Sequence, residues 1–295
     1  MKKLSILLTI LTFLACEKDI DIDLDQTTEK IVVDATIENG VAPRVILSRS
    51  LEYFSKIDPA ILASSFVRNA RIIISDGTRT HQLVEDSLTT TQGTTIYYYT
   101  INVLEPQTAI FGQLNGSYSM QITVDGKEYS ATTTIPDTTR QIDSLWWEPV
   151  QIFEPEDSNL AKVIIRATDK PGLGDYIRYY TRSNSEAFFP GLNSVFDDQV
   201  IDGTTYTFPI DKGVNKNEDR TDGEAFFNRG DTVTIKLSNI DKVTYDFWRT
   251  FEFSYQSVGN PFSNPTKILS NIKGDALGYF GGYASQYRTI IIPPR

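Results

Sequence analysis

Short segments in which apolar and polar residues alternate dominate the chain from Ile31 onward, and they constrain its fold more than any other feature. In Ser117–Val124, for example, every second side chain is apolar. Alternation with a period of two is typical of a β-strand that buries one face. Asp76-Gly77 and Asp125-Gly126 separate neighbouring segments and supply the positive φ angles that tight hairpin turns need. The pattern therefore predicts a mainly β protein with antiparallel pairing.

The predicted strands fall into two groups, in residues 30–140 and residues 141–295. The first group contains strands at Ile31–Ile37, Arg44–Ser50, Ala70–Ser75, Thr80–Glu85, Thr95–Val103, Ser117–Val124 and Glu128–Ile135. Their number and spacing predict an immunoglobulin-like or transthyretin-like β-sandwich that lacks the Cys-Trp-Cys core of antibody domains. The second group contains strands at Lys162–Ala167, Tyr176–Ser183, Thr204–Pro209, Thr232–Leu237 and Thr289–Ile292. We expect a second β-rich domain there.

One segment of the second domain has helical periodicity, and it predicts an amphipathic helix near residues 241–255. Its apolar residues recur every four positions and are Val243, Phe247, Phe251 and Tyr255, joined by Trp248. Its polar residues, expected to face water, are Lys242, Asp246, Arg249 and Glu252. Asp241 is the predicted N-cap. We interpret the aromatic stripe as core packing against a sheet and not as a ligand site.

The N-terminus has the organisation of a lipoprotein signal peptide over residues 1–15. Lys2 and Lys3 precede the apolar run Leu4–Ala15, which is too short to span a bilayer as a helix. Cys16 follows at once, and Phe13-Leu14-Ala15-Cys16 resembles the lipobox of bacterial lipoproteins. We expect Cys16 to be acylated and to become the mature N-terminus. The alternative is an ordinary secretory signal that is followed by an incidental cysteine.

Residues 16–29 form an acidic tether after this cysteine. Residues 17–29 carry six acids and one base, a local charge of −5. The segment that begins Glu17-Lys18-Asp19 is similar to the export signal by which Bacteroidota send lipoproteins to the outer face of the outer membrane. We therefore expect a lipid-anchored protein that faces the cell exterior. A simple solvated spacer on a periplasmic protein is the alternative.

Counts of cysteine, histidine and charge exclude several function classes. One cysteine and one histidine exclude an internal disulfide, a zinc site with several cysteines and a site with several histidine ligands. A net charge of −10 argues against nucleic acid, whose binding depends on lysine and arginine. We expect His81 to be an ordinary exposed or half-buried strand residue. No cofactor or metal site is predicted, although a weak calcium site in Gly213–Glu224 stays open.

No catalytic motif stands out among the 38 acidic residues. Asp197-Asp198 and Glu218-Asp219 are the densest acidic pairs, and we expect both to lie in solvated loops. Trp146 and Trp147 are adjacent on a predicted strand, so their side chains should point to opposite faces and at most one could serve as a sugar platform. We therefore predict that the protein is not an enzyme. A hydrolase that uses paired carboxylates is the alternative.

Several segments together resemble a family of Bacteroidota outer-membrane lipoproteins, the domain of unknown function 4249. They are Cys16–Asp19, Ile31–Ala35, Asp143–Leu145, Asn260–Pro265 and Leu277–Tyr283. The resemblance implies a two-part β protein on a lipid anchor, commonly encoded near TonB-dependent transporters of the outer membrane. It implies no catalytic activity and carries no active-site residues onto this sequence.

The C-terminal motifs contain aromatic residues that could have either a structural or a binding role. Phe262, Tyr279, Phe280 and Tyr283 either fill the core or form a partner-binding loop. We expect a non-enzymatic accessory or binding subunit of an outer-membrane β-barrel, foremost a TonB-dependent transporter. The alternatives are a module that captures glycans or peptides and a component of outer-membrane assembly or secretion machinery.

Overall fold

The computed structural model describes residues 29–51, 59–90, 93–150, 159–216, 225–258, 260 and 266–295. Cys16, the Glu17-Lys18-Asp19 segment and Phe262 lie outside the described residues, as does the Glu218-Asp219 pair. In the described part of the chain, no helix combines the length and the apolar character that crossing a membrane requires.

The fold is mainly β, as the alternation predicts. Its strands are β1 (Ile31–Glu38), β2 (Arg44–Arg49), β3 (Arg71–Ser75), β4 (Thr80–Thr89), β5 (Thr95–Thr100), β6 (Gly116–Val124), β7 (Lys127–Ile135), β8 (Arg140–Pro149), β9 (Leu160–Asp169), β10 (Tyr176–Ser183), β11 (Phe189–Phe196), β12 (Thr205–Ile210), β13 (Phe227–Asn228), β14 (Thr232–Ile240) and β15 (Ala276–Ile291). The helices are α2 (Pro59–Ser65) and α3 (Lys242–Ser257). All expected segments lie in strands, and most bounds differ by a few residues, but the expected strand Thr289–Ile292 is only the end of the longer β15.

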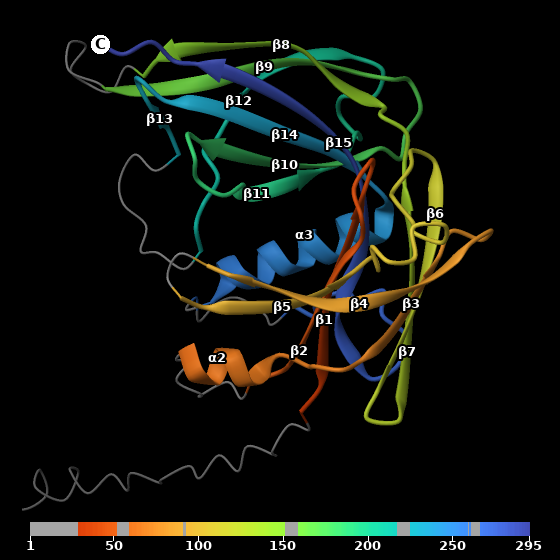
Figure 1. Ribbon diagram of the computed structural model, residues 1–295. Coiled ribbons are helices and arrows are strands. Elements are labelled where there is room, and N and C mark those ends of the chain that lie inside the picture. Colours follow the sequence, from red (N-terminus) through yellow and green to blue (C-terminus); the bar gives the residue numbers. More distant parts are fainter. Residues whose placement is uncertain are drawn as a thin grey trace, which may run out of the picture.

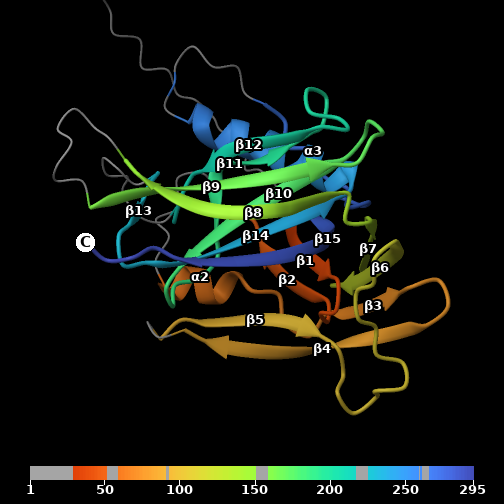
Figure 2. The same cartoon turned by 90° about the horizontal axis from the view of Figure 1, so that it is seen from above.

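One long sheet runs through both halves of the molecule (Figure 1). Its 11 strands follow the order β11-β10-β14-β15-β1-β2-β5-β4-β3-β6-β7. A second sheet has the order β12-β9-β13, with β8 also paired to β9. Figure 2 shows β8 and β9 lying across β10 and β14, and buried residues of β9, β10 and β14 form one apolar cluster between these two layers.

Strand β15 belongs to both halves. Its first part pairs in parallel with β1, so that Ile31 faces Ala276, and its second part pairs antiparallel with β14, where Thr232 faces Ile291. The apolar cluster of the first half contains residues of β1, β2, β3, β6 and β7 together with Ile272 and Phe280. Residues near the C-terminus therefore complete a core whose other strands all precede residue 140.

The C-terminal aromatic residues were expected either to fill the core or to form a partner-binding loop, and three of them are buried. Tyr279, Phe280 and Tyr283 lie in β15 and not in a loop, and their exposed fractions are 5%, 0% and 3%. The neighbouring glycines permit this burial, because a Cβ atom at Gly282 would lie 2.4 Å from the carbonyl oxygen of Thr134 in β7. The three side chains therefore do not form an exposed partner-binding loop.

Helix α3 begins as expected, because the side chain of Asp241 accepts a hydrogen bond from the backbone N–H of Thr244 at 2.9 Å. Its buried face differs from the expected one. Val243 and Tyr255 are 43% and 40% exposed, whereas Glu252 is only 4% exposed. The Glu252 carboxylate accepts hydrogen bonds from Ser194 in β11, and this polar partner turns the helix away from the face that apolar periodicity favours.

His81 is also more buried than expected, at 1% exposed. Its Nδ1 lies 2.8 Å from the Thr108 hydroxyl, and its Nε2 accepts from the backbone N–H of Asn102 at 2.8 Å. Burial lowers the pKa of the imidazole, and the nearby Glu105 carboxylate opposes that shift in part. His81 thus holds a connection between strands in place.

Candidate functional site

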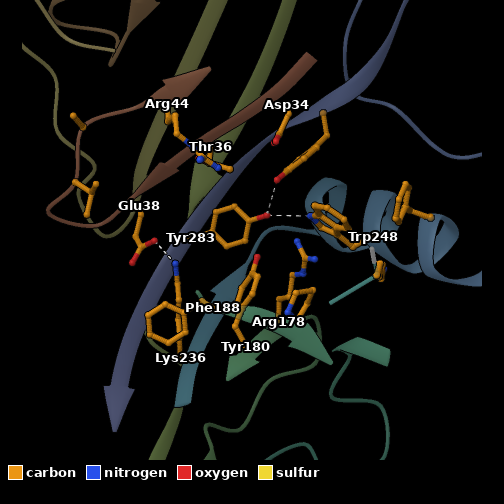
Figure 3. A pocket seen from close by; sticks show the side chains of 16 residues that line it. Asp34, Thr36, Glu38, Arg44, Arg178, Tyr180, Phe188, Lys236, Trp248 and Tyr283 are labelled. Atoms are coloured by element: carbon orange, nitrogen blue, oxygen red, sulfur yellow. Dashed lines mark hydrogen bonds and ion pairs between the residues drawn. The ribbon is translucent and has the colours of Figure 1, made fainter. Parts of the chain in front are cut away.

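A cavity of about 600 Å³ lies where the two halves of the molecule meet. Strands β1, β2, β10, β14 and β15 and helix α3 all contribute to its wall (Figure 3). Its volume is within the range of small-molecule sites, and its position between two cores is a common one for such sites. We therefore treat it as the candidate functional site.

Strand β1 supplies a polar side of the cavity. Its odd-numbered residues, from Ile31 to Ile37, are buried in the first core. The even-numbered residues Asp34, Thr36 and Glu38 point to the other face and line the cavity. The same alternation that builds the core thus places two carboxylates and a hydroxyl in the site.

An aromatic cluster forms the opposite side. The Trp248 Nε1–H donates to the Tyr283 hydroxyl at 3.0 Å, and the Tyr283 hydroxyl donates to that of Tyr279 at 3.3 Å. Trp248 meets the Tyr279 ring edge-on with 5.0 Å between centroids, and Phe247 stacks on Tyr279 at 4.5 Å. These contacts fix the rings, because each hydroxyl and the indole N–H are already oriented by a neighbour.

Arg178 lies behind this aromatic cluster and is only 2% exposed. Its guanidinium carbon lies 3.3 Å from the centroid of the Trp248 ring and 4.7 Å from that of Tyr180, and Figure 3 shows it beside Trp248. Its Nε donates to the Ser194 hydroxyl at 3.1 Å, and Ser194 donates to Glu252. Burial acts to lower the pKa of Arg178, but the nearby Tyr hydroxyls and Glu252 raise it, so the group stays charged.

Lys236 and Glu38 form an ion pair across the cavity, and both are half-buried (Figure 3). The second carboxylate oxygen of Glu38 accepts from the Tyr287 hydroxyl at 2.5 Å. The Lys236 ammonium also lies 5.3 Å from the centroid of the Tyr180 ring. Both oxygens of Glu38 are therefore engaged, which suits a fixed acceptor better than a proton-transferring acid.

The cavity is positively charged in an acidic protein. Four basic residues line it, Arg44, Arg178, Lys216 and Lys236, against the two acids Asp34 and Glu38. The lining thus has a net charge of +2, whereas the whole chain has −10. Burial lowers the pKa of the Lys216 ammonium, and the Glu252 carboxylate raises it in part. A lining of this sign favours an anionic ligand.

A separate acidic cluster corrects a second expectation. Asp198 is not in a solvated loop but 1% exposed, and it accepts from the backbone N–H groups of Gly174 and Asp175 at 2.8 and 2.9 Å. Oxygen atoms of Asp169, Asp175 and Asp198 lie within 4.8 Å of one another. Burial raises the pKa of Asp175, a hydrogen bond with Thr139 lowers it, and the two neighbouring carboxylates raise it further.

Trp146, Trp147 and Asp197 do not line the cavity. Trp147 packs against the second apolar cluster, whereas the Nε1–H of Trp146 donates to Glu148 at 3.2 Å. Of the expected loop residues, Tyr279 and Tyr283 do reach the cavity wall, but from a buried strand. Asp197 accepts from the Tyr245 hydroxyl at 3.1 Å.

Most of the lining was not predicted from the sequence. Asp34 and Glu38 carried a readable signal, because acids stand at regular positions in a strand whose other face is apolar. Arg178 carried a weaker one as one of two arginines in the strand Tyr176–Ser183, most of which is buried. No local sequence pattern predicts that Lys236 and Trp248 line the same cavity, because their positions there depend on the tertiary structure.

Comparison with known families gives one result. A family model described as "Domain of unknown function (DUF4249)" matches residues 17–289. No curated protein matches the chain.

Proposed function

We propose that this protein, which belongs to the domain of unknown function 4249 family, is a ligand-capturing lipoprotein of the outer membrane. In this proposal it faces the cell exterior, has no catalytic activity, and serves as an accessory or binding subunit of a β-barrel, foremost a TonB-dependent transporter. The observation that carries the capture role is the positively charged, aromatic-walled cavity between the two halves.

The ligand we propose is a sugar fragment that bears a carboxylate. Lysine and arginine side chains recognise a carboxylate, and Arg44, Lys216 and Lys236 are accessible in the lining. The half-buried rings of Tyr180, Phe188 and Phe251 can pack against the apolar faces of sugar rings.

Replacing Lys216 by methionine should weaken binding of a uronic-acid oligosaccharide about tenfold, because it removes one charge-assisted contact and keeps the apolar stem. Titration calorimetry measures the affinity. In the parent protein the affinity should fall as the pH rises through the pKa of Lys216, which burial places below its ordinary value of 10.5, because the neutral amine no longer attracts the anion. The Lys216→Met variant should lose that dependence.

Lys242→Met is the matched control, because Lys242 is exposed on α3, pairs with Asp246 and does not line the cavity. It should leave the affinity unchanged. Equal binding of a neutral oligosaccharide of the same length would contradict the ligand class, as would tighter binding of an acidic peptide. Absence of binding to every sugar and peptide tested would reject the capture role.

The accessory role has its own test, which does not depend on the ligand. The tagged protein, extracted from its native membrane in mild detergent, should bring down a β-barrel in stoichiometric amount. Cys16→Ser removes the expected acylation site and should move the protein to the soluble fraction and abolish recovery of the barrel. Repeated recovery of the acylated protein alone would reject the role. A barrel of assembly or secretion machinery would replace the transporter as partner.

A further inference from the structure

Three buried donor atoms that find no acceptor among the described residues lie at one end of the second core. Arg140 is fully buried, and its Nε donates to Asp169 at 2.9 Å. Among the described residues nothing accepts from its Nη1 and Nη2 atoms, or from the buried hydroxyl of Tyr206. The guanidinium carbon lies 5.9 Å from the centroid of the Tyr206 ring, so the groups are neighbours. Buried donors are nearly always satisfied, and these therefore call for an acceptor.

The same two residues line a second cavity, of about 460 Å³. The rest of its wall is mainly apolar and includes Ile177 and Phe208. Phe196 and Val200 also line it and are 42% and 92% exposed, so the cavity opens to solvent on their side. A pocket with apolar walls and a few convergent polar groups is the usual form of a small-molecule site.

The surrounding charge selects a neutral ligand. Asp169 already pairs with Arg140, and Asp175 and Asp198 lie close to Asp169. Asp197 lines the cavity itself. The carboxylates therefore outnumber the one guanidinium, and a further negative charge would be repelled. A carbonyl oxygen accepts hydrogen bonds without adding a charge.

We propose that this second cavity binds a small neutral ligand whose apolar body fills it and whose carbonyl oxygen accepts hydrogen bonds from Arg140 and Tyr206. A simple amide, ester or ketone about the size of one aromatic ring has this chemistry. The site shares no lining residue with the charged cavity, so it stands independently of the proposed capture function.

Benzamide, toluene and benzoate are the probes that test the proposal, because they share a ring and differ in acceptor and charge. Protein-observed NMR titration should give the tightest binding for benzamide, about tenfold tighter than toluene, with benzoate weaker than benzamide and resonance shifts centred on Tyr206 and Phe208. Equal affinities for benzamide and toluene would overturn the proposal, and so would tighter binding of benzoate or no binding of benzamide.

Tyr206→Phe removes one donor and keeps the ring, so it is the informative variant. The variant should bind benzamide about threefold to tenfold more weakly than the parent protein, and its affinity for toluene should be unchanged. Tyr98→Phe is its matched control, because the Tyr98 hydroxyl donates to Asp86 on β4, away from the cavity. An unchanged benzamide affinity in Tyr206→Phe would refute the acceptor contact. Lys216→Met should leave benzamide binding intact, which separates this test from that of the charged cavity.

Discussion

Replacing Gly278 by alanine should lower the free energy of unfolding by about 3 kcal/mol or more. Gly278 lies opposite Val33 where β15 pairs with β1, and its φ is +99°. A Cβ atom there would lie 1.9 Å from the Val33 carbonyl oxygen, so the two strands would have to separate. Urea denaturation followed by circular dichroism measures the loss.

Gly77→Ala is the matched control for this change. Gly77 also has a positive φ, +85°, but a Cβ atom there would have no neighbour within 4 Å. Only the backbone strain remains, which costs about 1–2 kcal/mol. The difference between the two variants thus isolates the contact of β15 with β1. Equal losses would show that the close approach to Val33 is not a constraint.

Replacing Arg178 by methionine should lower the free energy of unfolding by about 3–5 kcal/mol, because it removes a buried positive charge near the buried Glu252 carboxylate. Arg178 also covers the Trp248 ring and donates to Ser194, so the wall of the charged cavity should loosen at the same time. Urea denaturation gives the stability, and near-ultraviolet circular dichroism reports the order of the Trp248 environment.

Two further variants make this prediction specific. Arg44→Met also removes a cation from the cavity lining. Because Arg44 is exposed, the free energy of unfolding should change by no more than about 0.5 kcal/mol. Combining Arg178→Met with Glu252→Gln removes the unpaired charge while the amide oxygen still accepts from Ser194, so part of the lost stability should return. If the double variant were no more stable than Arg178→Met, charge compensation would not be the role of Arg178.

Local patterns predicted the elements of this fold well. The alternation in Ser117–Val124 reappears as β6, with Tyr118, Met120, Ile122 and Val124 all buried. Asp241 caps helix α3 as its position before the periodic segment indicates. The turn at Asp125-Gly126 joins β6 to β7, and both residues have positive φ. These features depend on neighbours in the sequence, which is why they can be read from it.

The candidate site was much harder to predict, because its parts come from distant elements. Glu252 was expected to face water, and only the position of Ser194 on β11 explains its burial. The adjacent acids Asp197-Asp198 predict a solvated loop, but two backbone N–H groups satisfy Asp198 in the interior. In each case a polar partner far along the chain reverses the preference that the residue type alone suggests.

The place of β15 in both cores has a consequence for the order in which the chain can fold. Strand β1 is made early, yet its parallel partner β15 begins at Ala276, far along the chain, and is synthesised much later. Until then the first core lacks Ile272 and Phe280, and one edge of β1 has no partner. Contacts between such distant segments slow folding. The N-terminal half should therefore reach its native state only after β15 has been synthesised, together with the C-terminal half and not before it.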